Sequence, residues 1–391
     1  MPCASPDSGQ VKRPFSNLLA QTQSDTAMKY KHPLKRILRE NRSLWDVEST
    51  RPAVRSAFNK AIGCGTAALG AEVYSSDVEQ RVVFHTCKGR ACSSCGARAT
   101  SRWQRERWAA LPDVRYKGIT FTMPDVLWPF FHDRQLTRLL PMLAAKTIQA
   151  WMHAKFGLQA GVIAILHTFN SRLDFNAHVH VMVTAGGLEA SGRWRSSVYF
   201  DVDALTRYWR KGVIRVLRAS LRSGTLGTDL PAEQVAAMLR TQENRWWSVK
   251  LQSLGSKEHF LRYAGRYARR PPIAQRRITG ICTAEIRFWA KDKKQHCRRI
   301  VRLTPEEFIS AWMAHIPNEY EHAVRSFGLF ASRAIRNSSA AVFNILGHSP
   351  RPRPKPLSWN LSIKRDFGWD PLLDRNGNRM RWTRRIVPES R

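Results

Sequence analysis

The chain has 391 residues, 43% of them hydrophobic, so it can bury a core in two or three modest domains and is not a disordered polycation. Lys and Arg number 64 against 30 Asp and Glu, and the formal net charge of +34 predicts a polyanionic partner. There is no apolar run of membrane-spanning length and no signal-peptide core, which argues against a membrane or secreted protein and predicts a soluble, intracellular one.

Aromatic residues accompany the basic ones along the chain. There are 14 Trp, 17 Phe and 8 Tyr, and stretches such as RWQRERW and QENRWWSVK interleave them with arginine and lysine. Basic side chains bind phosphates while aromatic rings stack on unpaired bases. The pattern therefore favours single-stranded nucleic acid over a merely solvated basic surface.

The first third of the chain divides by composition. Residues 1–50 are rich in Ser, Gln and basic residues, so we expect a mostly flexible arm with one short amphipathic stretch, LKRILRE. Residues 51–112 contain a cysteine-rich segment with helical patterns at both ends. The seven cysteines of the chain are odd in number and three are crowded together, which favours metal ligation over a disulfide framework.

The crowded cysteines have the spacing of zinc ligands. The stretch CKGRACSSCG supplies Cys87, Cys92 and Cys95. Either Cys64 or His85 can complete a tetrahedral site with them. Chance clustering is the alternative, and we predict one Zn²⁺ in this N-terminal domain.

From residue 113 onward, strand and helix patterns follow one another. Alternating apolar runs predict strands over 114–124, 161–169, 175–187 and 278–292. Helical periodicity predicts helices over 135–156, 205–221, 257–270 and 304–316. Pro271 and Pro272 end the third of these helices, and Thr304 before Pro305 is typical of a helix N-terminus. After about Ser349 the sequence becomes basic and proline-rich.

The stretch DFNAHVHVMVTAGG places two histidines inside an apolar strand pattern. Residues i and i+2 of a strand share a face and lie about 7 Å apart. His178 and His180 should therefore point the same way, while Val179 and Val181 enter the opposite layer. Two imidazoles on one face can hold a divalent cation; the alternative is a core histidine with satisfied hydrogen bonds.

The stretch YAGRY places two tyrosines on a predicted helix. Tyr263 and Tyr267 are four residues apart, which puts both hydroxyls on one face of that helix. Tyrosines at this spacing often serve packing alone. The flanking residues here are basic, which suits a phosphate backbone better than a core. We expect phosphate contacts from Arg262, Arg266, Arg269 and Arg270.

A histidine pair, a tyrosine pair and a basic surface together indicate phosphoryl transfer to tyrosine. A cation on the histidines would polarise a phosphodiester, and a phenolic oxygen would attack it in line and join DNA to the protein through a 5′-phosphotyrosine bond. The phenol needs help to ionise, because the pKa of a free tyrosine is about 10. Two tyrosines allow one DNA end to be held while another is cut.

These residues resemble the HUH rolling-circle transposases with two tyrosines, a family found in bacterial insertion sequences. The resemblance extends from about Cys64 to Phe330 and rests on FTMP, NAHVHVMVTAGG, YAGRYARRPPI followed by RRITG, and VRSFGLF. It implies a transposase that moves an insertion sequence by a rolling-circle mechanism, in the bacterial cytoplasm and associated with the nucleoid. Its partners would be single-stranded element ends and target DNA.

By this resemblance, His178 and His180 correspond to the HUH metal ligands, and Tyr263 and Tyr267 to the two nucleophiles. The implied fold is α+β, with a mainly antiparallel sheet flanked by helices as the catalytic core, a small N-terminal zinc-binding domain and helical additions. We expect a flexible arm, a zinc-binding domain that recognises DNA, a catalytic domain with helical insertions, and a basic proline-rich tail. Their boundaries are 1–50, 51–112, 113–345 and 346–391.

The expected cofactors are Zn²⁺ in the N-terminal domain and Mg²⁺ or Mn²⁺ at the HUH histidines. Magnesium prefers oxygen ligands, whereas manganese accepts imidazole. A third ligand is usual in HUH sites, and the sequence leaves it open. The candidates beside the histidines are Asp174 and Asn176, and those one turn from the first tyrosine are Glu258 and His259.

Three other functions are compatible with parts of the sequence. A metallohydrolase would normally carry further ligands just after the histidines, where VMVTAGG has none. A rolling-circle plasmid replication initiator or relaxase shares the chemistry, but the zinc segment and the RPPI and RRITG stretches favour the transposase. A decayed transposase kept as a nucleic-acid-binding protein would leave the paired histidines and tyrosines without a role.

Overall fold

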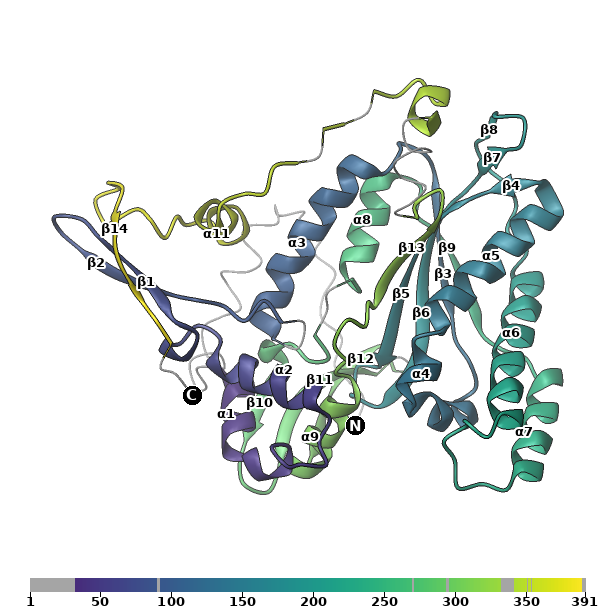
Figure 1. Cartoon of the computed structure of the whole chain (residues 1–391), viewed down its shortest axis with the longest axis horizontal. Coiled ribbons are helices and arrows are strands. Elements are labelled where there is room, and N and C mark those ends of the chain that lie inside the picture. The colour runs from purple at the N-terminus through teal and green to yellow at the C-terminus, as the bar shows by residue number, and fades with distance from the viewer. Residues whose placement is uncertain are drawn as a thin grey trace.

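The computed structural model describes residues 32–89, 92–268, 271–292, 295–331, 341–349, 351–352 and 354–388. Its centre is a five-stranded sheet in the order β13-β5-β6-β3-β9, in which all neighbours are antiparallel (Figure 1). The strands are β3 (Tyr116–Phe121), β5 (Gly161–Phe169), β6 (Phe175–Thr184), β9 (Val249–Ser253) and β13 (Val324–Gly328). The predicted mainly antiparallel core is confirmed.

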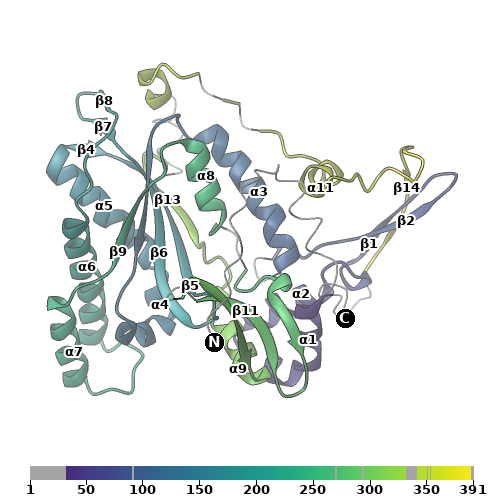
Figure 2. The ribbon, with the colours of Figure 1, turned by 180° about the vertical axis from the view of Figure 1, so that it is seen from behind.

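Side-chain alternation gives the sheet two different buried faces. Val179 and Val181 of β6 belong to a core that includes the long helices α5 and α6, whereas Ile165 of β5 and Met182 of β6 pack with α8 and α3 on the other side (Figures 1 and 2). The helices of the first side are α4 (Arg134–Thr137), α5 (Leu140–Phe156), α6 (Val202–Arg222) and α7 (Ala232–Asn244). Those of the second side are α3 (Ser93–Ala110) and α8 (Lys257–Gly265).

The predicted helices are present, with two differences. The helix expected over 135–156 is divided into α4 and α5, and Pro141 occupies the first turn of α5, where its missing N–H is not needed. The helix expected over 257–270 already ends at Gly265, a residue with low helix propensity. Tyr267 therefore lies in the turn that follows α8 and not on the helix itself.

A second body is formed by the N-terminal helices and a segment that follows α8. One buried cluster joins Ile37 of α1, Phe58 of α2, Phe288 of β11 and Trp312 of α9. These elements are α1 (Pro33–Glu40), α2 (Pro52–Gly63), β10 (Ile278–Ile281), β11 (Ile286–Asp292), β12 (Cys297–Leu303) and α9 (Pro305–Ala314). The predicted start of α9 is confirmed, because Thr304 caps it in a capping box.

This second body differs from the predicted division of the chain. The arm expected over 1–50 includes α1, whose apolar side is buried; residues 1–31 lie outside the described part. The segment 278–316, expected within the catalytic domain, buries its apolar residues against the N-terminal helices. The reason is that the inner residues of β11 and α9 face α1 and α2 and not the central sheet.

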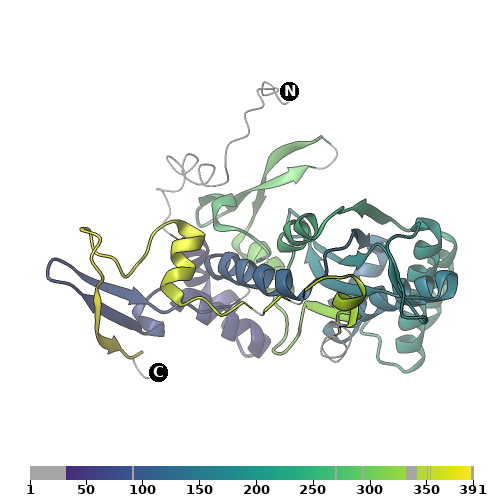
Figure 3. The same cartoon turned by 90° about the horizontal axis from the view of Figure 1, so that it is seen from above.

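The C-terminal segment contributes a strand to the N-terminal region. β14 (Arg381–Ile386) pairs antiparallel with β1 (Ala71–Ser75), which also pairs with β2 (Gln80–Phe84) (Figure 3). The predicted basic tail therefore contains ordered elements, including α11 (Trp359–Phe367).

The remaining short elements are β4 (Leu158–Gln159), β7 (Gly187–Glu189), β8 (Trp194–Arg195), η1 (Arg42–Leu44), η2 (Ala67–Leu69), η3 (Asp125–His132) and η4 (Gln275–Arg277). Within the described residues, every helix is too short or too polar to cross a bilayer.

Candidate active site

Strand β6 presents two histidines toward α8. Its alternation buries Val179 and Val181 on the opposite face, as the sequence pattern predicts. The Nε2 atoms of His178 and His180 lie 3.2 Å apart. Two ring nitrogens at this separation can bind the same cation.

A third histidine comes from the neighbouring strand. His167 of β5 lies directly opposite His178 in the antiparallel register, and its side chain is buried. One ring nitrogen from each of His167, His178 and His180 lies within 4.8 Å of the others. This residue was missed by the sequence analysis, because a single histidine in an apolar strand gives no signal until the strand pairing is known.

The residues considered as third ligands lie elsewhere. Asp174 is exposed and accepts a hydrogen bond from Asn170, and Glu258 and His259 are exposed near the start of α8. Asn176 contributes through its backbone, because its carbonyl oxygen accepts a hydrogen bond of 2.7 Å from Nδ1 of His178. Within the described residues, the structure thus brings His167 to the two predicted histidines, whereas Asp174, Glu258 and His259 are not part of this cluster.

Hydrogen bonds orient the histidine rings. Since Nδ1 of His178 donates to a carbonyl, the neutral ring carries its lone pair on Nε2. Nε2 of His167 lies 3.0 Å from the backbone oxygen of Tyr267 and must donate to it, which places the lone pair of that ring on Nδ1. Three oriented imidazoles fit a divalent transition metal such as Mn²⁺ better than Mg²⁺, which prefers oxygen.

Both tyrosines reach the histidine cluster. The hydroxyl of Tyr263 lies 3.3 Å from Nδ1 of His180 and 3.5 Å from Oγ1 of Thr120. The ring of Tyr267 stacks on the imidazole of His180, with ring centroids 3.7 Å apart. Burial raises the pKa of Tyr263 to about 12, so its phenol is protonated at neutral pH in the absence of an added positive charge.

The predicted phosphate-binding arginines are only partly described. Arg262 and Arg266 are exposed beside the tyrosines, and the guanidinium of Arg266 lies 6.0 Å from the centre of the Tyr263 ring. Arg269 and Arg270 lie outside the described residues. Of the two described arginines, Arg266 thus lies near the ring of Tyr263.

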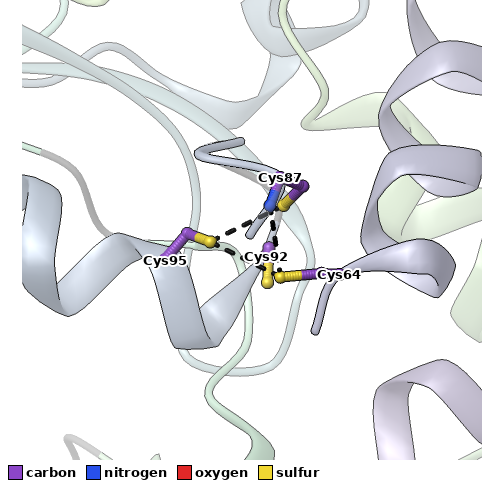
Figure 4. Close-up of side chains that lie close together, drawn as sticks. All are labelled: Cys64, Cys87, Cys92 and Cys95. Atoms are coloured by element: carbon purple, nitrogen blue, oxygen red, sulfur yellow. Dashed lines mark hydrogen bonds between the residues drawn. The ribbon is translucent and has the colours of Figure 1, made fainter. Parts of the chain in front are cut away.

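Four cysteines form a second candidate metal site (Figure 4). Cys64 follows α2, Cys87 lies in the loop after β2, Cys92 precedes α3 and Cys95 lies in its first turn. Their sulfur atoms lie within 4.8 Å of one another, with Cys64 to Cys95 at 3.6 Å and Cys87 to Cys95 at 3.7 Å. Sulfurs about 2.3 Å from a tetrahedral Zn²⁺ would be about 3.8 Å apart.

The fourth member of this cluster is Cys64 and not His85. Nδ1 of His85 donates to the backbone oxygen of Leu69 at 3.0 Å, and Nε2 lies 3.3 Å from the carboxylate of Glu72. Both nitrogens of His85 are thus directed to other partners.

Comparisons with known proteins match the regions that contain the two candidate sites. A family model described as "Transposase zinc-binding domain" matches residues 36–123, and one described as "Putative transposase" matches residues 161–339. The transposase for insertion sequence element IS801 from Pseudomonas savastanoi pv. phaseolicola is 30% identical and covers 83% of this chain and 82% of its own length. "Putative transposase y4qJ" from Sinorhizobium fredii is 28% identical, over 74% of this chain and 77% of its own length. No solved structure matches the chain.

The two matched family models together define a transposase with a zinc-binding domain. The chain belongs to the family of insertion-sequence transposases that includes the IS801 transposase. DNA is therefore its partner, and the cysteine cluster together with the matched domain indicates Zn²⁺.

Proposed function

We propose that this transposase cuts and rejoins single-stranded DNA through 5′-phosphotyrosine intermediates, and so moves an insertion sequence by a rolling-circle mechanism. The observation that carries the proposal is the convergence of His167, His178 and His180 with Tyr263 and Tyr267 on one face of the sheet. The tyrosines act as nucleophiles and the histidines as ligands of Mn²⁺ or Mg²⁺.

The proposed reaction begins with a tyrosine oxygen as the nucleophile. A phenolic oxygen attacks the phosphorus, the bond between phosphorus and the 3′ oxygen breaks, and that oxygen leaves as a hydroxyl. The phenol proton passes to solvent and the leaving oxygen takes up one, so the new phosphotyrosine bond retains the energy for rejoining. A divalent cation would supply the positive charge that polarises the scissile phosphate.

The chain's own groups prepare Tyr263 for this attack. When Nε2 of His180 carries the lone pair, Nδ1 carries the proton and donates to the Tyr263 oxygen across 3.3 Å. A donor at that position stabilises the phenolate as it forms. Arg262 and Arg266 add positive charge nearby and hold the strand by its phosphates.

Two tyrosines and the zinc-binding region suit strand transfer. One tyrosine keeps the first DNA end bound while the other cuts the second, which a simple nicking enzyme does not need. The zinc-binding region, with α3 starting at its cysteines, would recognise the ends of the element. The reaction would take place in the bacterial cytoplasm, at the nucleoid.

Cleavage of single-stranded oligonucleotides with and without Mn²⁺ tests this function. His178→Ala and His180→Ala should abolish cleavage and leave single-strand binding nearly unchanged, because binding depends on basic and aromatic side chains. EDTA should act like these substitutions, and His153→Ala, an exposed histidine on α5, is the matched control. Cleavage that persists in the double variant would refute the metal assignment.

A further inference from the structure

The hairpin of β11 and β12 has one buried and one exposed face. Phe288 of β11 packs into the N-terminal body, and Ala290 on the same face of the strand is buried. The alternate residues of β11 point outward together with their cross-strand partners. We call these six residues the hairpin face: Arg287 opposite Arg302, Trp289 opposite Ile300, and Lys291 opposite Arg298. Figure 3 shows the hairpin, in green, projecting from the rest of the molecule.

The basic residues of the hairpin face lie opposite one another and so destabilise the hairpin when nothing is bound to it. Like charges directly opposite each other destabilise an antiparallel pair. Glu285 offsets one pair in part, lying 3.3 Å from Nε of Arg287 and 3.5 Å from Nη1 of Arg302. In the described part of the chain, no carboxylate pairs with Lys291 or Arg298. Phosphates of a bound polyanion would provide the missing negative charge.

An apolar pair lies between the two basic pairs. Trp289 is 38% exposed and Ile300 is 45% exposed, so both present apolar surface to solvent between the charged side chains. A strand rises about 3.4 Å per residue, so each basic pair lies about 7 Å from this apolar pair. An unpaired base can stack on Trp289 while the phosphates on either side of it meet the basic pairs. Duplex DNA keeps its base faces covered and offers no such contact.

The hairpin is fixed to the strands that carry the histidines. The hydroxyl of Ser171, in the turn between β5 and β6, donates to the backbone oxygen of Lys291 at 3.0 Å. Nε of Arg277 donates to the backbone oxygen of Trp289 at 2.6 Å, and Nη2 of the same arginine donates to the backbone oxygen of Ser171. These contacts join β11, near the turn of the hairpin, to the end of the sheet where β5 and β6 join.

We propose that the hairpin face binds single-stranded DNA beside the cleavage site, with a base stacked on Trp289 and phosphates held by the basic pairs on both sides. The proposal rests on the single-strand activity proposed above and adds a surface to it. The hairpin face would hold the strand that leads to or from the tyrosines.

Binding of a fluorescent single-stranded oligonucleotide to the zinc-loaded full chain, measured by anisotropy without added Mn²⁺ or Mg²⁺, tests the proposal. Trp289→Ala should weaken binding about tenfold, and Trp289→Tyr should recover most of the loss because it keeps a stacking ring. Lys291→Gln combined with Arg298→Gln should reduce the slope of log affinity against log salt by about 1.4, the value for two lost phosphate contacts. Duplex DNA of the same sequence should show little change with Trp289→Ala.

A matched control removes the same charge elsewhere. Arg207→Gln with Lys211→Gln alters two exposed residues of α6 and should leave the salt slope closer to that of the wild type. Equal losses in both double variants, unchanged binding by Trp289→Ala, or an equal loss on duplex DNA would overturn the proposal. Because neither Mn²⁺ nor Mg²⁺ is added and no cleavage occurs, this outcome is independent of the phosphotyrosine assay, in which the hairpin stays intact.

Discussion

At the scale of single residues, the candidate active site depends on contacts that local sequence reveals only in part. The shared face of His178 and His180 follows from strand alternation alone. His167 became part of the cluster only through the register of β5 against β6, which is set by non-local pairing. The sequence held one signal that could have identified His167. Because a third ligand was expected, a histidine in a neighbouring predicted strand was worth considering.

Thr120 is another residue that the sequence did not indicate. Its Oγ1 lies 3.2 Å from Nδ1 of His180 and 3.5 Å from the Tyr263 hydroxyl. Loss of a group that orients a metal ligand typically costs roughly 10- to 100-fold. We expect Thr120→Val to slow single-strand cleavage by this factor without weakening DNA binding. Thr241→Val, on the exposed side of α7, is the control, and a wild-type rate for Thr120→Val would contradict the role.

His315 makes the stability of the fold depend on pH. Burial lowers its pKa to about 4, while Nε2 donates to the backbone oxygen of Leu173. Because the pKa of His315 is lower in the folded protein than in the unfolded one, the stability that the neutral ring contributes is complete above pH 6.5. As the pH falls toward 4, roughly 3 kcal/mol of this stability is lost. Urea unfolding at pH 7 and pH 4 should show a larger loss for the wild type than for His315→Gln. The same loss in both proteins would contradict this prediction.

At the scale of elements, α3 fixes the position of the tyrosine-bearing helix. The side-chain amide of Gln104 donates to the backbone oxygen of Leu261 at 2.8 Å, and α8 approaches α3 most closely at Gly265. A Cβ at Gly265 would collide with Nε2 of Gln104 and lie 3.4 Å from Cγ2 of Thr100. The zinc-binding region and the candidate nucleophiles are thus joined by two packed helices.

Gly265→Ala should disturb this packing. We expect a loss of roughly 1–3 kcal/mol in the free energy of unfolding and a slower cleavage rate, because α8 is displaced relative to the histidines. Gln104→Ala in the same chain removes the colliding side chain and should recover part of both losses. A Gly265→Ala protein as stable and active as the wild type would show that the two helices pack less closely.

The elements that sequence patterns predicted best are those with strong local signals. The capping box of Thr304 and the buried run of β6 are examples. The end of α8 was predicted several residues too far along the chain, because the prediction used Pro271 and Pro272 as the stop signal in place of Gly265. The strand β14 was not predicted, since five of its six residues are exposed and its pairing with β1 spans most of the chain.

At the scale of the whole molecule, the zinc site stabilises more than the segment that contains its ligands. Cys64, Cys92 and Cys95 belong to the same buried cluster as Phe288 of β11 and Trp312 of α9. Sequence composition could not foresee this joint core, because four of the five strands of the central sheet lie between the two halves in the sequence. Metal binding and folding should therefore be coupled across both halves.

Cys92→Ser tests this coupling. We expect the bound zinc to be lost and amide-exchange protection to fall in α1, α2 and β11, while β5 and β6 remain protected. Cys282→Ser, at an exposed cysteine, should change neither property. A wild-type protein that contains no zinc would contradict this coupling of zinc binding to folding. Unchanged amide-exchange protection of β11 in Cys92→Ser would contradict it as well.

In the proposed mechanism, Tyr263 and Tyr267 become covalently linked to DNA. The most direct test incubates the protein with Mn²⁺ and a single-stranded oligonucleotide that spans an element end, digests the covalent product and identifies the DNA-linked peptide. We expect peptides that contain Tyr263 or Tyr267, a reduced yield when one is replaced by Phe, and no adduct when both are, since Phe keeps the ring and removes only the hydroxyl. A DNA-linked peptide that contains neither tyrosine would contradict the mechanism.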